Sequence, residues 1–217
     1  MQTADIARVL IALAAGYLLG AIPFGILVPK LIGGPDPRTI GSGRTGGANV
    51  SRAVGFRWAL VSGLLDVAKA SVAVLLVIAI GGDSIAQVVA ALAAIVGHSR
   101  SVFIGFHGGR GVAPATGGAI VLAPIILAAI FPVFAISILV TRISSIGSLS
   151  ASLIGGIAMV VVAAVNHLDP IFFVYGIGVP GLIWAFHVDN IQRLLAGQER
   201  RIGTKVTPPT GTQRSDS

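Results

Sequence analysis

The sequence predicts an all-α polytopic membrane protein with seven transmembrane or partly inserted helices, its N-terminus outside and its C-terminus cytoplasmic. The first observation behind this class is composition. Of the 217 residues, 54% are hydrophobic and only 11% are charged, and the mean hydropathy is +0.92. Soluble domains carry about 25% charged residues, so this chain is too apolar to be one. The other two observations are a series of apolar runs and an uneven distribution of basic residues between them.

Six apolar runs meet or approach the length of about 20 residues that a membrane span needs. They cover residues 5–30, 58–80, 85–98, 115–142, 148–166 and 171–186. We expect the first run to be a retained span, because Asp5 and Arg8 precede a long apolar stretch that lacks the short apolar region and cleavage site of a secretory signal. The breaks at 81–83 and 166–170 contain neither Lys nor Arg, so both are expected outside.

The remaining connections hold most of the basic residues and are therefore expected inside. These residues are Lys30, Arg38, Arg44, Arg52, Arg57, Arg100, Arg110, Arg142, Arg193, Arg200, Arg201 and Lys205. The run 115–142 then begins and ends on the same side, so we expect two short helices that turn near Phe131 and Pro132, because proline interrupts the helical hydrogen bonds. The alternative is one long kinked span, which would place Arg142 outside and reverse every later segment.

Residues 1–203 are expected to form a single integral membrane domain. Residues 204–217, rich in Thr, Pro and Ser, are expected to be a disordered cytoplasmic tail. The formal charge of +7 does not indicate nucleic-acid binding, because a chain this apolar has no soluble basic face to carry it. The absence of cysteine from the sequence excludes a disulfide framework, a zinc-thiolate site, an iron–sulfur cluster and an acyl-cysteine mechanism.

Three segments that are expected on the cytoplasmic side contain glycine, basic and amide residues. A membrane-spanning chain does not need such residues in order to fold. The first, residues 41–52, reads GSGRTGGANVSR. Gly41, Gly43 and Gly46 match the dinucleotide-binding fingerprint, but they follow a membrane span and not a strand, so that interpretation fails. Glycines still let the backbone approach an anion, and the Ser42 hydroxyl and Arg52 guanidinium would complete an oxyanion or phosphate cradle.

The second segment, residues 97–113, reads GHSRSVFIGFHGGRGVA. Gly108, Gly109 and Gly111 surround Arg110 just before another predicted helix, which indicates a second anion-binding nest. The third segment, residues 187–201, reads HVDNIQRLLAGQERR. If it is helical, His187, Asn190 and Arg193 fall on one face that can present polar groups to a bound head group.

Together the three segments resemble the three motifs of the acyl-phosphate-dependent glycerol-3-phosphate acyltransferases of bacterial membranes, the PlsY family. The family motifs run roughly GSGNxGATNxxR, GHxxPVFxxFKGGKGVAT and HxxNIxRLxxGxE. The similarity also includes 20–24, Asp36, Arg38, Asp66 and Lys69, so it covers most of the chain. Six positions depart from the family's usual residues, namely Arg44, Ala48, Ser101, His107, Arg110 and Pro114.

The resemblance implies a multi-pass protein of the plasma or inner membrane whose active site faces the cytoplasm. It implies transfer of a fatty acyl group from acyl phosphate to the 1-hydroxyl of sn-glycerol 3-phosphate. The products are lysophosphatidic acid and phosphate, in the first step of phospholipid synthesis. The implied partners are these two substrates, membrane lipid and, functionally, an enzyme that forms acyl phosphate. We expect no metal and no cofactor, because the sequence shows neither a metal-ligand cluster nor a nucleotide loop.

The resemblance also implies site residues. Ser42, Asn49 and the backbone of Gly108, Gly109 and Gly111 would cradle the acyl phosphate, while Arg52, Arg110, His187 and Asn190 would hold glycerol 3-phosphate. The full expected substrate-binding set is Gly41, Gly43, Asn49, Arg52, Gly108, Gly109, Arg110, Gly111, His187, Asn190, Arg193 and Glu199. Ser42 and His98 are the expected catalytic residues.

The identity of the general base stays open, because His98 and a phosphate of the bound substrate are both candidates. Ser42 as a covalent nucleophile is an alternative that would need a paired base. We interpret Asp66 and Lys69 as a buried structural ion pair, Arg44 as an orientation signal or lipid contact, and Glu199 as a brace for the third segment. Two other functions remain open: a transporter or flippase of phosphorylated metabolites, and an assembly protein.

Overall fold

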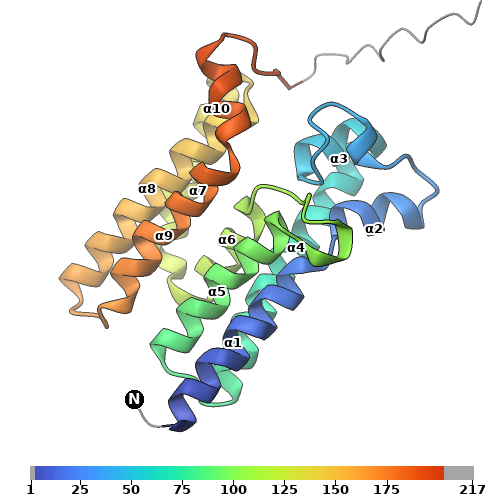
Figure 1. The fold of residues 1–217 in the computed structure, drawn as a ribbon. Coiled ribbons are helices and arrows are strands. Elements are labelled where there is room, and N and C mark those ends of the chain that lie inside the picture. The colour runs from blue at the N-terminus through green and yellow to red at the C-terminus, as the bar shows by residue number, and fades with distance from the viewer. Residues whose placement is uncertain (1–2, 203–217) are drawn as a thin grey trace, which may run out of the picture.

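The computed structural model describes residues 3–202, and this part of the chain is helical with no strand (Figure 1). The expected tail 204–217 lies outside the described residues. The elements in chain order are α1 Thr3–Ala21, α2 Phe24–Leu31, η1 Pro37–Thr39, α3 Gly47–Val54, α4 Phe56–Ala79, α5 Ser84–Ser99, η2 Val102–Ile104, α6 Val112–Leu122, η3 Pro124–Ile126, α7 Leu127–Thr141, α8 Ser144–Val165, α9 Ile171–Phe186 and α10 Val188–Leu195, where η marks a 3-10 helix.

Within residues 3–202, five helical stretches are long and apolar enough to cross a membrane. They are Thr3–Leu31, Phe56–Ala79, Ser84–Ile104, Pro124–Thr141 and Ser144–Val165. A sixth crossing is formed if α9 and α10, which are bent by 65° at their junction, count as one span. Helix α6 is also apolar but shorter. The protein is therefore a multi-pass membrane protein.

The turn predicted near Phe131 and Pro132 is wrong in position. The chain breaks at Ala123 and Pro124, where α6 ends, and Pro132 lies inside α7. Pro124 occupies the first position of η3, where a missing N–H costs no helical hydrogen bond. Pro132 is tolerated within a helix because membrane helices compensate locally for the lost bond. The run still divides into two helices, α6 and α7, as predicted.

Small residues bring α1 and α5 unusually close together. A Cβ atom added at Gly20 would lie 2.6 Å from the Cα of Ala94, and one at Gly97 would lie 2.9 Å from the backbone N of Ala21. Close approach through small residues is the usual basis of helix association in membranes, where apolar side chains gain little by leaving lipid. This contact fixes the end of α5, from which the second segment begins.

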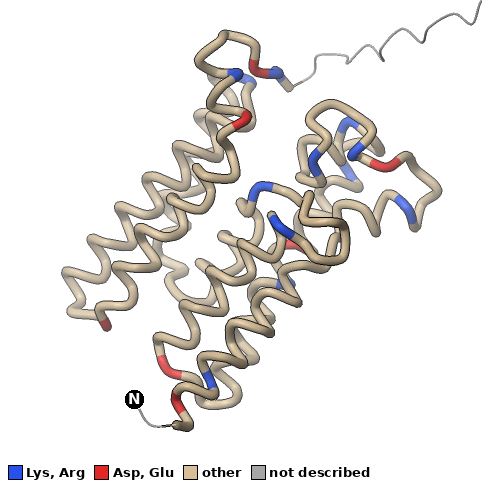
Figure 2. The backbone as a smooth tube through the Cα atoms, viewed as in Figure 1, with Lys and Arg blue, Asp and Glu red and all other residues tan. Residues whose placement is uncertain are grey.

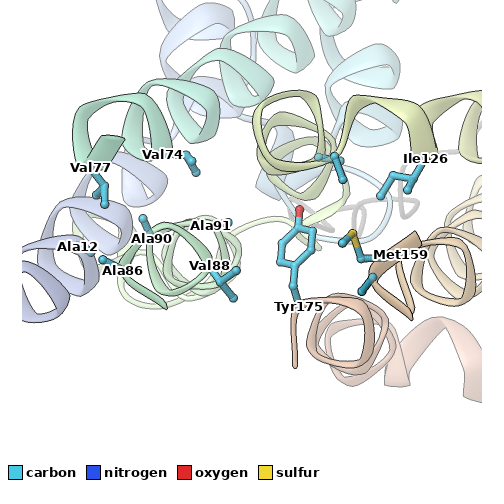
Figure 3. Packing of buried hydrophobic residues seen from close by; sticks show 13 residues of the cluster. Ala12, Val74, Val77, Ala86, Val88, Ala90, Ala91, Ile126, Met159 and Tyr175 are labelled. Carbon is cyan, nitrogen blue, oxygen red and sulfur yellow. The ribbon is translucent and has the colours of Figure 1, made fainter. Parts of the chain in front are cut away.

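The buried core joins α1, α4, α5 and α6 to α8 and α9. Figure 3 shows Tyr175 of α9 pointing toward α6, with Met159 of α8 and Ile126 of η3 to one side of its ring and Val88 of α5 to the other. All four are at least 96% buried. By contrast α7 has no buried residue, so it lies at the edge of the bundle.

Figure 2 shows most Lys and Arg residues at one end of the molecule, around α2, α3, the loop before α6 and α10. We call this the basic end. The opposite end carries Asp5, Asp83 and Asp169 with Arg8. The three predicted segments all lie at the basic end, although they are separated by up to 146 positions, from Gly41 to His187, in the sequence.

Candidate active site

The first segment is folded around one buried side chain, Asn49, which is 2% exposed. Its amide nitrogen donates to the carbonyl oxygens of Pro37 at 2.6 Å, Ile40 at 2.7 Å and Arg44 at 2.9 Å. Its Oδ1 accepts from the Ser42 N–H and from Arg52 Nη1, both at 3.3 Å. Asn49 therefore holds Ser42 and Arg52 in place and uses its own polar atoms to do so, which makes it a positioning residue here.

Two glycines of this segment are required by backbone conformation. Gly41 has φ of +58° and Gly43 has φ of +68°, and L side chains rarely adopt such values. A Cβ at Gly41 would also lie 2.5 Å from Asn49 Oδ1. Between these glycines, Ser42 is half-buried, and within residues 3–202 its hydroxyl has no hydrogen-bond partner. No base is paired with it in this part of the chain.

The second segment packs directly on the last turn of α5. The N–H of Gly108 donates to the Ser99 carbonyl at 3.2 Å, and that of Gly109 donates to the His98 carbonyl at 3.1 Å. A Cβ at Gly109 would collide with His98 Nε2. The N–H groups of these two glycines are thus directed at protein. The first turn of α6 can still offer an anion the N–H groups of Val112 and Ala113, since Pro114 has no N–H and Ala115 donates to the Gly111 carbonyl.

Beneath this loop lies a buried polar cluster. Lys69 Nζ lies 2.6 Å from Asp66 Oδ1 and donates to the Ile22 carbonyl at 2.7 Å, and His98 Nδ1 lies 3.1 Å from Lys69 Nζ. The predicted Asp66–Lys69 ion pair is confirmed. Because Ile22 lies at the break between α1 and α2, the cluster ties that break to the end of α5. His98 has its Nδ1 in this cluster and its Nε2 against Gly109, so it supports the loop from below.

The third segment begins at a bend that fixes His187. This imidazole is 2% exposed, and its Nδ1 lies 2.7 Å from the Ile183 carbonyl. A carbonyl can only accept, so Nδ1 carries the proton and Nε2 is left as an acceptor. Burial lowers the pKa of His187 to about 4, and the nearby Arg110 charge acts in the same direction. His187 is therefore neutral at physiological pH.

Two carboxylates organise the rest of the segment. Glu199 accepts from Asn190 Nδ2 and from Arg193 Nε, both at 2.8 Å, so it braces the segment as predicted. Asp189 accepts from Arg110 Nη2 at 2.8 Å and lies 3.4 Å from Arg193 Nη2. The Arg110–Asp189 pair joins the second segment to the third. Arg100 of the second segment also contacts the end of α9, with its guanidinium 5.4 Å from the centre of the Phe186 ring.

Charged residues of the first segment interact with charged residues of the second and third segments. Burial alone would raise the pKa of Asp189, but the charges of Arg110, Arg44 and Arg193 lower it below the ordinary value. Similarly, Arg52 interacts with the charges of Arg200 and Glu199. Arg44 therefore lies close enough for its charge to act on both Arg110 and Asp189.

Several buried polar atoms of this region have no hydrogen-bond partner within residues 3–202. They are Arg44 Nη1, Arg110 Nε, Asp189 Oδ1 and Asn190 Oδ1. Native proteins rarely leave buried polar atoms unsatisfied, so a cluster of them marks a place where a polar ligand can bind. Sequence reasoning missed two members of this cluster. Asp189 occupies a variable position of the third motif, and Arg44 is a departure from the first.

An apolar cavity of about 110 Å³ adjoins the polar site. Its lining includes Val112, two residues after Arg110, and Ile183, whose carbonyl bonds His187. From there it extends between α6, α7, α8 and α9 to Met159 and Tyr175. Along α8 it spans Ser148 to Met159, which at 1.5 Å per residue is roughly 16 Å. The region therefore combines a cationic polar mouth with an elongated apolar interior.

A family model described as glycerol-3-phosphate acyltransferase matches residues 10–197. The chain belongs to this family. A glycerol-3-phosphate acyltransferase of Roseiflexus sp. (strain RS-1) is 39% identical over 199 residues, which are 91% of this chain and 95% of the relative. One of Synechococcus sp. (strain JA-3-3Ab) is 43% identical over 196 residues, covering 90% and 94%. The protein is therefore an acyltransferase.

Two crystal structures of PlsY (YgiH), an integral membrane glycerol 3-phosphate acyltransferase, share the fold of this family member. The glycerol 3-phosphate form superposes with a TM-score of 0.81 and 34% identity, covering 90% of this chain and 96% of that one. The lysophosphatidic acid form gives a TM-score of 0.80 at the same identity and coverage. The resemblance to the PlsY family is confirmed.

Proposed function

We propose that this acyltransferase transfers a fatty acyl group from acyl phosphate to the 1-hydroxyl of sn-glycerol 3-phosphate, forming lysophosphatidic acid and phosphate. The observation that carries the proposal is the polar site around the Arg110–Asp189 pair together with the apolar cavity that adjoins it, whose lining includes Val112 and Ile183. Both substrates are phosphates and one has a long chain, so both features are needed. The relatives' names and the glycerol 3-phosphate form of PlsY support the acceptor, and the motif resemblance supports the donor.

The acceptor's phosphate would bind Arg110 and the first turn of α6. A guanidinium offers a phosphate two parallel donors, and a helix N-terminus adds free N–H groups and partial positive charge. Neutral His187 would then accept a hydrogen bond from a substrate hydroxyl through Nε2. The buried Asn190 Oδ1 is a second acceptor in the same place.

The donor's acyl chain would enter the apolar cavity, with its phosphate near Ser42 and Arg52. Burial of a methylene group contributes about 0.8 kcal/mol, so even part of a chain binds well. The Ser42 hydroxyl and the Arg52 guanidinium would stabilise the charge that develops on the carbonyl oxygen.

The reaction forms one C–O bond and breaks another. The acceptor hydroxyl oxygen attacks the acyl carbon, the bond from that carbon to the phosphate oxygen breaks, and phosphate leaves with the electron pair. The hydroxyl proton passes to a phosphate oxygen of the bound substrates. We favour a phosphate oxygen over His98 as the group that takes this proton, because the His98 ring is enclosed by Lys69, Asp66 and Gly109. Positioning and electrostatics would supply most of the rate.

The experiment uses purified protein in detergent, with phosphate release measured from synthetic acyl phosphate in the presence and absence of glycerol 3-phosphate. We expect release to depend on both substrates. Ser42→Ala and Arg52→Ala should each abolish it, while Arg8→Ala, at the opposite end of the molecule, should leave it unchanged. Full activity in the Ser42 or Arg52 variant contradicts the site assignment. A requirement for acyl-CoA contradicts the donor assignment.

A further inference from the structure

Asp189 is an acidic residue in a place where the proposed substrates would bring more negative charge. Its carboxylate accepts from Arg110 Nη2 at 2.8 Å and lies 3.4 Å from Arg193 Nη2. The charge of Arg44 also acts on it. The Asp189 side chain is 32% exposed and that of Arg110 is 17% exposed, so the pair lies at the surface of the site rather than deep in the core.

Asp189 uses only one of the two N–H donors on one edge of the Arg110 guanidinium. Guanidinium groups pair best with carboxylates and phosphates through two parallel N–H donors, and Nε and Nη2 form one such edge. Asp189 takes only Nη2, while Arg110 Nε is buried without a hydrogen-bond partner within residues 3–202. A phosphate has enough oxygens to take both donors. It would therefore satisfy an atom that Asp189 leaves unsatisfied.

We propose that Asp189 competes with the phosphate of the acceptor for the same edge of Arg110, and so sets how tightly the site holds phosphates. This inference rests on the proposed function, because it takes the bound ligand to be a phosphate ester. On exchange, the phosphate takes the Arg110 edge and Asp189 turns to Arg193, which already lies within ion-pair distance. Neither guanidinium is then left without an anion.

Weaker phosphate binding has a use in the proposed reaction, because inorganic phosphate is a product that must leave. A site with several arginines and no internal acid would retain it. The competing carboxylate would lower the affinity for the acceptor and the product alike, so that both exchange readily. Asp189 would act through Arg110 and not on the reacting atoms, which makes it a positioning residue.

The test is Asp189→Asn, which removes the charge at almost constant volume. Partly exposed ion pairs contribute up to about 1 kcal/mol, so we expect the KM for glycerol 3-phosphate and the dissociation constant for inorganic phosphate each to fall about fivefold. Asp189→Ser, which also removes the charge, should act in the same direction. Asp5→Asn removes a carboxylate at the opposite end of the molecule and should change neither constant. An unchanged or increased dissociation constant in both Asp189 variants overturns the inference.

A double-mutant cycle with Arg110→Gln separates direct competition from general repulsion of anions. If Asp189 acts through Arg110, Asp189→Asn should no longer tighten phosphate binding in the Arg110→Gln background. A fivefold gain that persists there overturns the inference in favour of a long-range effect. Phosphate binding is measured by calorimetry without turnover, so it can support the competition even if the protein does not use acyl phosphate. Failure of the proposed function would be seen separately, in the release assay.

Discussion

Asn49 shows how much of the site depends on one side chain that sequence reasoning had assigned to the substrate. Its five hydrogen bonds reach Pro37, Ile40, Ser42, Arg44 and Arg52. An amide is the only side-chain group that offers two N–H donors on one side and an oxygen acceptor on the other. The spacing of the motif could predict that Asn49 is needed, but the reason requires the fold, because three of its five partners are backbone carbonyls that no sequence pattern marks.

Asn49→Asp tests this role because it keeps the shape and removes the donors. The new carboxylate would face three carbonyl oxygens, and an unpaired buried polar group costs about 1 to 3 kcal/mol, more when charged. We expect acyltransferase activity to fall more than tenfold, together with a lower melting temperature in detergent. Asn166→Asp, at an exposed site where the side chain meets only the Val162 carbonyl, is the matched control. Wild-type activity in Asn49→Asp contradicts the role.

A second prediction for a single residue concerns the protonation state of His187. Its pKa is lowered to about 4 from 6.5, so folding favours the neutral ring. The resulting stability, on the order of 3 kcal/mol, is present above pH 6.5 and is lost as the pH falls from 6.5 toward 4, because the unfolded chain then binds the extra proton. Nitrogen NMR of histidine-labelled protein, with His187→Asn to assign the signal, should show a neutral ring protonated at Nδ1 at pH 6. A doubly protonated ring at that pH contradicts the prediction.

Among the structural elements, the loop of the second segment is held in place by hydrogen bonds to α5, whereas the sequence predicted a glycine nest that binds an anion. Three glycines around Arg110 correctly indicated a close approach of the backbone. The approach that the structure shows is to protein, since Gly108 and Gly109 donate to carbonyls of α5 and Gly109 packs on the His98 ring. The sequence could not reveal this, because it depends on the contact between α1 and α5 that positions the last turn of α5.

Gly109→Ala should therefore disturb the site through the loop. Its Cβ would collide with His98 Nε2, and the ring cannot easily retreat because Nδ1 is held by Lys69 and Asp66. We expect the loop to shift with Arg110, and the KM for glycerol 3-phosphate to rise at least tenfold. Gly63→Ala in α4, where an added Cβ meets nothing within 4 Å, is the control. Equal KM values in the two variants would show that the packing of Gly109 on His98 is unimportant.

Helix boundaries were predictable where proline or a polar residue ends an apolar run, as at 171–186, which lies between Pro170 and His187 and matches α9. They were less predictable within 115–142, where two prolines compete to interrupt one run. The run is interrupted at Pro124, which is the first residue of η3, whereas Pro132 is accommodated inside α7. Tertiary partners such as Asp189 with Arg110 were not predictable, because the two residues are 79 positions apart.

For the whole molecule, the separation of charge shown in Figure 2 predicts its orientation. We propose that the basic end faces the cytoplasm of a bacterial inner membrane, because loops rich in Lys and Arg are retained on that side. The chain has no cysteine, so single cysteines can report on each end. A cysteine replacing Asn166 should react with a membrane-impermeant maleimide in intact spheroplasts. One replacing the exposed Leu195 of α10 should react only after permeabilisation. The reverse pattern contradicts this orientation.

We propose that the polar site and the adjoining apolar cavity together bring an acyl phosphate and glycerol 3-phosphate into reaction. This proposal is tested most directly by incubating the purified protein with ¹³C-labelled palmitoyl phosphate and glycerol 3-phosphate and quantifying both products by mass spectrometry and phosphate assay. We expect one labelled 1-acylglycerol 3-phosphate for every phosphate released, with no nucleotide, CoA or carrier added. Release of phosphate together with free palmitate in place of the acylated product, or no reaction until acyl-CoA is supplied, would contradict it.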